Sequence, residues 1–307
     1  MPTVLGIKYS VPRILVGGLV CATWLSLSGL LGGYETRQLS LLVRADEECR
    51  LDPAWQEETK AVVDAVSRSF DKLFGIRFVI GEFGEWTSPD SVASLEHLAE
   101  DLEARSNKGP HDILVALTAQ KNLDERYFGY SLFKEGLILI KMMGETRGLV
   151  KALEHEMAHL FGAVHVDDPD SLMDIHSRGN RFDDLNARII RLNRDRTFYG
   201  TRFPLPKENW EETAALCRKI ASAIQRTDRE KKGERGSAAR RPNLADVHLL
   251  LAQIYLEQAK YEAVMAECKK ALRIDPSNLE GLNLYGVALR RSDRIDEAIE
   301  KYQEILT

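Results

Sequence analysis

The spacing of apolar residues changes repeatedly between positions 38 and 160, and each change marks a new element of secondary structure. Residues 76–82 alternate as a strand does, whereas the apolar side chains from Val62 to Phe74 recur at helical spacing. Residues 112–118 form a continuous apolar run, which is typical of a strand buried on both faces. The order strand, helix, strand, helix, strand, strand, helix predicts a mixed α/β layer fold. The expected strands are 38–44, 76–82, 112–118 and 136–142, and the expected helices are 53–74, 91–105 and one beginning near 147.

The end of the chain repeats itself with a period of 34 residues. The corresponding pairs are Leu251 and Tyr285, Ala252 and Gly286, Tyr255 and Leu289, and Ala271 and Ile305. This spacing of small and large residues resembles the tetratricopeptide repeat (TPR), in which paired helices approach closely and neighbouring pairs stack. The resemblance covers residues 245–307 and implies a surface that binds a protein partner. Because two units are few for a stable stack, either a helix predicted at 209–226 completes it or the segment docks on a partner.

The N-terminal residues have the pattern of an export signal. Lys8 and Arg13 precede an apolar stretch at 14–31, as in a secretory signal peptide. The stretch also approaches the roughly 20 residues that span a bilayer, so an uncleaved membrane anchor is the alternative. Both interpretations predict an extracytoplasmic protein, which is secreted, periplasmic or anchored.

The composition narrows the classes of protein and partner. The 307 residues are 44% hydrophobic, and 42 Lys and Arg against 47 Asp and Glu give a net charge of −5, so nucleic-acid binding is not expected. Four cysteines in a chain of this length are too few for a disulfide-dense scaffold, and no two of them have CxxC spacing. If the leader is removed near Ser28, Cys49, Cys217 and Cys268 remain, and at most one disulfide can form within the chain.

Residues 155–165, HEMAHLFGAVH, combine the ligand types of a zinc site. His155 and His159 lie four apart on a predicted helix, so their imidazoles project from one face about one turn apart. Gly162 can end the helix in a left-handed conformation, which would turn the chain and bring His165 to the same metal. Three protein ligands leave the fourth position open for a water, as a catalytic zinc site requires.

Glu156 is the candidate catalytic residue. It is rotated about 100° around the helix from His155, so its carboxylate reaches a metal-bound water instead of the metal. Zinc lowers the pKa of that water toward about 7, and Glu156 acts as general base and then as general acid toward the leaving amine. An HExxH motif alone is moderate evidence, but Gly162 and His165 at fixed offsets make the pattern specific. The sequence therefore predicts one catalytic Zn²⁺.

The string HExxHxxGxxH resembles the active-site motif of the metzincin clan of zinc endopeptidases. The resemblance covers about residues 37–197 and implies an α+β catalytic domain, with a mixed sheet and an active-site helix, that precedes the all-α repeats. It also implies that Met173, at a matrixin-like spacing, lies in a tight turn beneath the metal and is not a ligand. The chain departs from the named branches at Val166, where matrixins have Ser and adamalysins have Asp. It departs again at Ile175, where astacins have a tyrosine, and it has no cysteine-switch propeptide.

These observations predict an exported zinc endopeptidase that acts on peptides or proteins. The alternatives are a TPR interaction protein with an inactive zinc-binding domain and a zinc hydrolase of a non-peptide amide. An extended substrate would pair with an exposed strand edge, and residues 136–141 are either that edge or an interior strand. Asp174 and His176 either line the cleft or support a ligand, and His176 is otherwise a solvent-facing loop residue.

The expected organisation of the chain has four parts. They are a signal peptide or anchor at 1–33, a metzincin-like zinc protease domain at 34–200, a connecting helix and basic linker at 201–242, and TPR-like repeats at 243–307. Further helices are expected at 182–197 and 209–226, and the polar, net basic residues 228–243 are expected to be a solvated connector. If the protease domain and the repeats are separate modules, deletion of 243–307 should leave cleavage of short peptides intact.

Overall fold

The computed structural model describes residues 35–123, 128–142, 145–175, 179–200, 203–230 and 241–305. The expected signal or anchor at 1–33 lies outside these residues, as do His176 and the centre of the predicted linker, 231–240. Across the described part of the chain, no helix is both long enough and apolar enough to cross a membrane.

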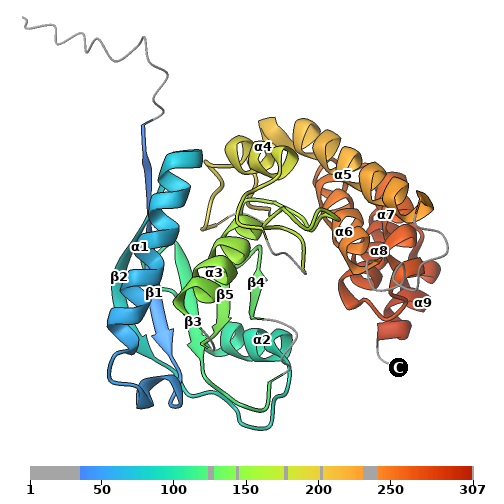
Figure 1. Ribbon diagram of the computed structural model, residues 1–307. Helices are drawn as coiled ribbons and strands as arrows, with labels where there is room; N and C mark the ends of the chain where they lie inside the picture. The colour runs from blue at the N-terminus through green and yellow to red at the C-terminus, as the bar shows by residue number, and fades with distance from the viewer. Residues whose placement is uncertain are drawn as a thin grey trace, which may run out of the picture. The chain divides into compact units, whose positions relative to one another are not determined.

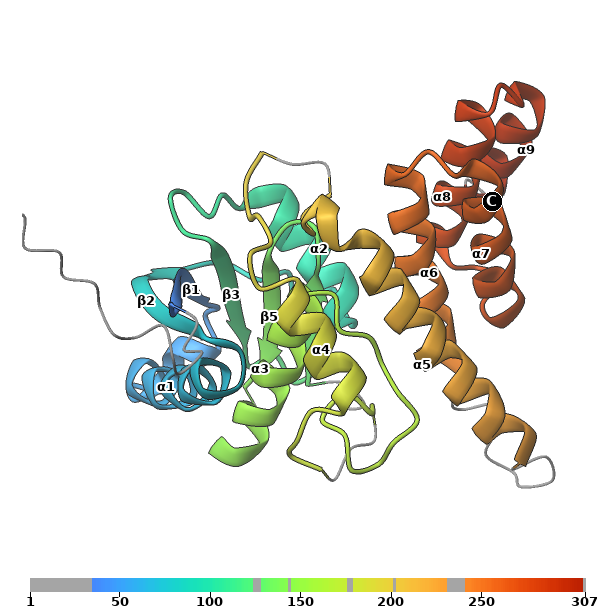
Figure 2. The ribbon, with the colours of Figure 1, turned by 90° about the horizontal axis from the view of Figure 1, so that it is seen from above.

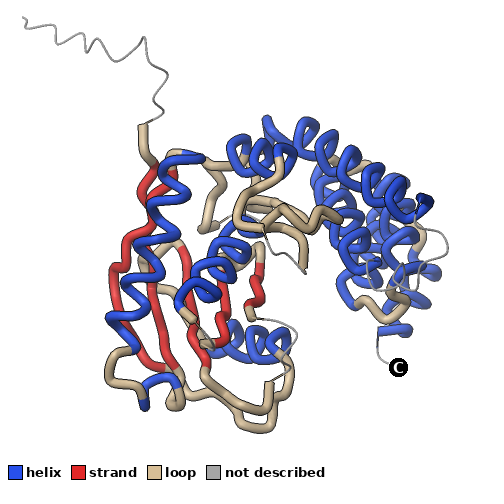
Figure 3. The backbone as a smooth tube through the Cα atoms, viewed as in Figure 1, coloured by secondary structure: helices blue, strands red, loops and turns tan. Residues whose placement is uncertain are grey.

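A five-stranded sheet with the order β2-β1-β3-β5-β4 lies in the N-terminal half of the described chain (Figures 1 and 3). Strands β1, β2, β3 and β5 are parallel, and β4 is antiparallel to β5. Every residue of β3 is buried, as its continuous apolar run predicts. The strands are β1 (Arg37–Ala45), β2 (Ile76–Glu85), β3 (Ile113–Thr118), β4 (Gly129–Leu132) and β5 (Leu137–Lys141).

The antiparallel edge strand β4 was not among the expected strands. Its four residues, Gly-Tyr-Ser-Leu, are all half-buried, and so short a segment with glycine and serine has no recognisable apolar pattern. Strand β5 lies between β3 and β4. The interpretation of residues 136–141 as the exposed edge is therefore wrong, and the interior alternative is confirmed.

Helices cover both faces of the sheet, as Figures 1 and 2 show. Successive residues of β1 point to opposite faces, so Leu41 belongs to one hydrophobic cluster and Leu42 to another. The first cluster includes the buried sides of α1 and α3, and the second includes the buried side of α2. These helices are α1 (Trp55–Phe74), α2 (Leu95–Arg105) and α3 (Thr146–Leu160), and a short 3₁₀ helix spans Cys49–Leu51.

After α3 the elements of secondary structure are all helices, joined by loops (Figure 2). Helix α4 ends at Leu192, five residues earlier than expected, and α5 extends four residues beyond its expected end to Glu230. Helices α6 with α7 and α8 with α9 form the two predicted repeat pairs, and α5 packs against α6. The predicted architecture, a mixed sheet with helices followed by helical repeats, is confirmed. The helices are α4 (Asp184–Leu192), α5 (Trp210–Glu230), α6 (Arg241–Glu257), α7 (Tyr261–Ile274), α8 (Leu279–Arg291) and α9 (Ile295–Ile305), with a 3₁₀ helix at Lys207–Asn209.

Helix α6 belongs to two hydrophobic clusters at once. Val247 and Ile254 are fully buried in the cluster that also holds α5, α3 and the first face of the sheet. Leu249 and Ala252, on another side of α6, are buried in the cluster formed with α7, α8 and α9. Apolar packing on α6 therefore joins the predicted repeats, 243–307, to the helices and sheet that precede them. The four-part division of the chain itself stays a prediction.

The three cysteines of the described chain are buried free thiols. Cys49 lies in the 3₁₀ helix before α1, Cys217 lies in α5, and Cys268 lies in α7. Burial raises the pKa of each thiol to about 12, so all three are protonated near neutrality and act as small apolar groups.

Candidate metal centre

Helix α3 carries two of the expected ligands and the candidate acid. Leu149, Leu153 and Met157 recur every four residues and bury one side of the helix against the sheet. His155 and His159 lie on roughly the opposite side and remain half-buried, so their rings are open to a ligand. The apolar side of the helix thus packs against the sheet, and the two imidazoles project from the other side.

The chain turns sharply where α3 ends. Gly162 has a φ of +85°, in the left-handed region that glycine tolerates at little cost. Its N–H donates to His159 O at 2.9 Å, and the N–H of Ala163 donates to Ala158 O at 3.2 Å. A Cβ at Gly162 would also lie 3.2 Å from Leu205 Cδ1. This turn directs the following residues back toward the helix face and places His165 beside the other two histidines.

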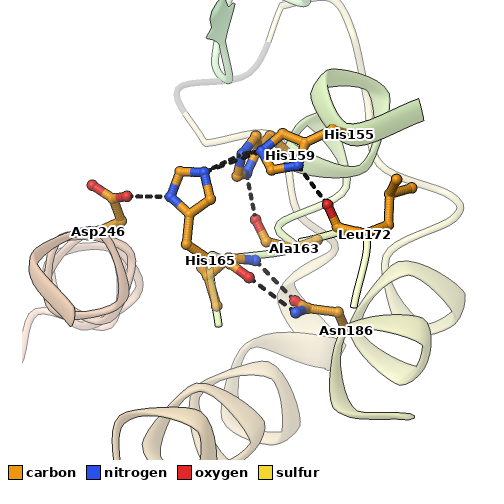
Figure 4. A network of polar contacts seen from close by, with 8 residues as sticks. His155, His159, Ala163, His165, Leu172, Asn186 and Asp246 are labelled. Atoms are coloured by element: carbon orange, nitrogen blue, oxygen red, sulfur yellow. Dashed lines mark hydrogen bonds and ion pairs between the residues drawn. The ribbon is translucent and has the colours of Figure 1, made fainter. Parts of the chain in front are cut away.

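The three imidazoles converge, as Figure 4 shows. The Nε2 atoms are 3.0 Å apart between His155 and His159, 3.1 Å apart between His155 and His165, and 3.2 Å apart between His159 and His165. Two nitrogens bound tetrahedrally at 2.0–2.1 Å from one zinc ion lie about 3.3 Å apart. The observed spacing therefore matches a set of ligands shared by one ion.

The opposite nitrogen of each ring, Nδ1, faces an oxygen acceptor. These acceptors are Leu172 O for His155 and Ala163 O for His159, both at 2.8 Å, and Asp246 Oδ2 for His165 at 2.6 Å. A neutral imidazole that donates its Nδ1–H carries an unprotonated lone pair on Nε2. Three such lone pairs directed at one another repel unless a cation lies among them. The donor set and its tautomers thus fit a zinc ion.

Burial and neighbouring carboxylates shift the pKa values of the three histidines in different directions. Burial lowers the pKa of His155 to about 3, and it also lowers the pKa of His159. For His165, burial again disfavours the imidazolium, but the carboxylates of Asp246, Glu156 and Asp174 outweigh it and raise the pKa. His155 and His159 are therefore neutral near pH 7, the form in which histidine binds a metal.

Glu156 is enclosed by α3 and the edge strand β4. Its side chain is buried, and burial raises its pKa to about 7, while a hydrogen bond from Ser131 acts in the opposite direction. A Cβ at Gly129 would lie 2.6 Å from Glu156 Cγ and 2.9 Å from Glu156 Oε1. Gly129 therefore leaves the space that Glu156 occupies. No motif in the sequence marked Gly129 or Ser131, because their strand was not recognised.

The backbone before His165 is held by a buried asparagine from α4. Asn186 Oδ1 accepts from the N–H of Val164 at 2.9 Å, and Asn186 Nδ2 donates to Val164 O at 2.9 Å. Asn186 is fully buried, and the carboxylate of Asp183 binds it as well. The side-chain amide thus pairs with both polar groups of the residue that precedes the third histidine (Figure 4).

A buried arginine supports the end of α3. Arg196 is fully buried, and its guanidinium donates to Leu160 O, at the last residue of the helix, and to Phe133 O at 2.9 Å. Its Cζ lies 4.2 Å from the centre of the Phe198 ring. Burial lowers the pKa of Arg196 to about 9. A positive charge at a helix C-terminus is favourable, so Arg196 helps to fix the helix that carries His155 and His159.

The other expected site residues lie in the segment after His165. Met173 is fully buried, its carbonyl accepts from the N–H of Val166 at 3.1 Å, and it follows Leu172, whose carbonyl holds His155. Met173 thus lies in a turn close to the three histidines, and its role as an apolar floor stays a prediction. Asp174 is near enough to influence His165. A hollow of about 730 Å³ lies elsewhere, between α1 and β2, and no histidine of the cluster lines it.

Two family models match the chain. Residues 35–184 match Reprolysin_5, metallo-peptidase family M12, and residues 245–278 match a tetratricopeptide repeat. The resemblances to a metallopeptidase and to TPR repeats are thereby confirmed. No curated protein matches the sequence.

Three solved structures show limited similarity to the chain. Metalloproteinase-II from Bacteroides fragilis is 16% identical over 52% of this chain and 54% of its own, with a TM-score of 0.35. The second TPR of Spaghetti (RPAP3) bound to an HSP90 peptide is 18% identical over 32% of this chain and 74% of its own, with a TM-score of 0.24. A chaperone–substrate complex is 12% identical over 52% of this chain, with a TM-score of 0.38, and the chain spans only 34% of its length.

Proposed function

From its metallopeptidase domain of family M12, we propose that this chain is a zinc-dependent endopeptidase. His155, His159 and His165 would hold one Zn²⁺, and Glu156 would serve as the catalytic acid and base. The observation that carries the proposal is the convergence of three Nε2 atoms at 3.0–3.2 Å, each on a ring whose Nδ1 faces an acceptor, next to a buried carboxylate.

The residues of the centre have distinct tasks. The Nε2 atoms of the three histidines would hold the ion. Zinc held there would supply Lewis acidity, which polarises the scissile carbonyl and acidifies a bound water. Glu156 receives the proton of the attacking water on its carboxylate and delivers it to the nitrogen of the leaving amine. Gly129 and Ser131 hold that carboxylate in place from β4.

The edge strand β4 is the proposed binding surface for an extended substrate. It pairs with β5 on one side, and within the described sheet no strand pairs with its other side. Main-chain hydrogen bonds to such an edge supply affinity without much demand on sequence. Because Gly129 and Ser131 of β4 contact Glu156, a peptide paired with this strand would pass close to the catalytic carboxylate.

Two other functions make different demands on these residues. An interaction protein with an inactive zinc domain would need the histidines but not Glu156, whereas this chain buries Glu156 in a space left by Gly129. A hydrolase of non-peptide amides would use the same residues, and cleavage of a peptide library separates it from a peptidase. Binding of a protein partner by the repeats and export directed by residues 14–31 are further parts of the proposal.

Replacement of Glu156 tests the proposal. Glu156→Gln should retain stoichiometric zinc and lose about 10²- to 10⁴-fold in peptide turnover, the usual contribution of a general acid–base. Glu154→Gln is the matched control, since Glu154 is a buried acid on the same helix that is hydrogen-bonded with Ser69. It should keep full turnover. Turnover of Glu156→Gln at the wild-type rate would remove Glu156 from the mechanism, and wild-type protein without bound zinc would refute the site.

A further inference from the structure

We propose that Asp246, on the first repeat helix, is a positioning residue of the metal centre that orients His165, so that the repeats form part of the zinc site. This inference rests on the proposed zinc function. Asp246 lies 81 positions after His165, and only the packing of α6 brings the two together. In Figure 4 the carboxylate approaches the imidazole from the side opposite the other two histidines.

His165 needs more support than the other ligands. His155 and His159 stand on a helix whose geometry sets their directions, and main-chain carbonyls hold their rings. His165 lies after the turn at Gly162, outside any helix or strand. Asn186 holds the backbone of the preceding residue but does not orient the imidazole ring. That task falls to Asp246, whose Oδ2 lies 2.6 Å from Nδ1.

Asp246 is itself held firmly. Ala245 and Val247, its neighbours, are buried in two different hydrophobic clusters, so α6 cannot rotate without opening one of them. His248 Nδ1 also lies 2.6 Å from Glu267 Oε2, a buried contact that ties α6 to α7. The Asp246 side chain keeps 45% of its surface exposed. The position of this half-exposed carboxylate therefore comes from its helix and not from burial of the group.

The contact has a defined chemical consequence. A carboxylate that accepts the Nδ1–H of a ligating histidine fixes the tautomer with a free Nε2, fixes the ring orientation and increases the basicity of the ligand. Loss of such a contact typically weakens metal binding by about 10- to 100-fold. Here the supporting group comes from the repeat segment, so zinc affinity is linked to the docking of α6.

The test measures zinc affinity of the full chain by competition with a chelator of known affinity. Asp246→Ala should weaken zinc binding by about 10- to 100-fold, and Asp246→Asn should fall between Ala and wild type, because its amide oxygen still accepts a hydrogen bond but carries no charge. Asp296→Asn, at an exposed acid of α9, is the matched control and should bind zinc as wild type does. Thermal unfolding with excess chelator should be the same for all variants.

The visible spectrum of the cobalt(II)-substituted protein gives a second readout that a purely structural role would not change. Asp246→Ala should alter the cobalt absorption bands, whereas Asp296→Asn should not. Wild-type zinc affinity and an unchanged cobalt spectrum in a folded Asp246→Ala variant would overturn this inference while leaving the proposed function intact. If wild-type protein binds no zinc, or if His159→Ala binds zinc as tightly as wild type, the proposed function itself fails.

Discussion

The two sides of the candidate metal centre are held by different kinds of structure. On the α3 side, the acceptors for His155 and His159 are main-chain carbonyls only 17 and 4 positions away. On the α6 side, the acceptor for His165 is a side-chain carboxylate from a helix 81 positions away. Carbonyl acceptors form with the local backbone, whereas the carboxylate is present only when α6 is packed against the rest of the protein.

This difference shows how a local histidine motif can depend on a distant segment. The motif at 155–165 contains all three histidines, yet the side-chain acceptor of the third one is Asp246 of α6. Helix α6 contributes to two hydrophobic clusters, so its packing stabilises both the region that contains the sheet and the repeat helices α7 to α9. Variants on the α6 side and on the α3 side can test this difference separately.

Removal of α6 should have the largest effect. A chain that ends at residue 240 exposes the surface against which Val247, Leu251 and Ile254 are buried. Each such side chain contributes about 1.5–3 kcal/mol of burial, which is large against a total stability of about 5–15 kcal/mol. We expect loss of the cooperative thermal transition and of stoichiometric zinc binding. This outcome is opposite to the one expected from the sequence alone for deletion of 243–307.

The matched control is a chain that ends at residue 276. It keeps α6, α7 and Asp246 but lacks α8 and α9. It should unfold at a lower temperature than the full chain and still bind one zinc ion. A chain ending at 240 that unfolds cooperatively and binds zinc as tightly as the full chain would show that the two parts are independent.

A change on the α3 side should have an intermediate effect and spare the metal. Gly129→Ala places a Cβ where Glu156 now lies, so the carboxylate must move. Displacement of a catalytic group by about 1 Å can cost up to about 100-fold in rate, so we expect a loss of about 10- to 100-fold in kcat/KM for a peptide, with zinc affinity unchanged.

Gly148→Ala is the control for the glycine substitution. Gly148 lies on α3, where a Cβ would meet no atom within 4 Å outside the backbone of its own helix, so alanine should fit and raise helix stability slightly. Its activity should equal that of wild type. If Gly129→Ala is equally active, Glu156 does not need the space left by Gly129.

The smallest effect is expected from the contact that anchors α6 to α7. Burial alone would raise the pKa of Glu267, but the hydrogen bonds from His248 and Lys270 together outweigh it and lower the pKa. A carboxyl whose pKa is lowered on folding stabilises the protein above its unfolded value of 4.5, and this contribution is lost as pH falls below it. Glu267→Gln should therefore be less stable than wild type at pH 7.

Urea unfolding in the presence of a chelator measures this difference without a contribution from the metal. The gap between wild type and Glu267→Gln should shrink as the pH falls from 6 toward about 3, because wild type alone loses the charged contact. A gap that is constant over this range would show that the charge on Glu267 does not stabilise the packing of α6.

Much of the local arrangement followed from the sequence. The spacing of His155 and His159, the turn at Gly162 and the 34-residue repeat are local patterns, and each is set by helix geometry or by the conformational freedom of glycine. The buried strand at 112–118 followed from its unbroken apolar run. Such features depend on neighbours in the chain, so they can be read without knowledge of the packing.

The supports of the site depended on the tertiary structure. Asp246, Asn186, Arg196 and Gly129 act on the site through contacts with residues far from them in sequence, and no spacing rule pairs such positions. The edge strand β4 was missed for a related reason, because four half-buried residues become a strand only beside β5. The sequence by itself determined which residue types could bind a metal and where the helix would place them. Only the packed chain decided which distant groups orient them, since that choice depends on how apolar surfaces are buried together.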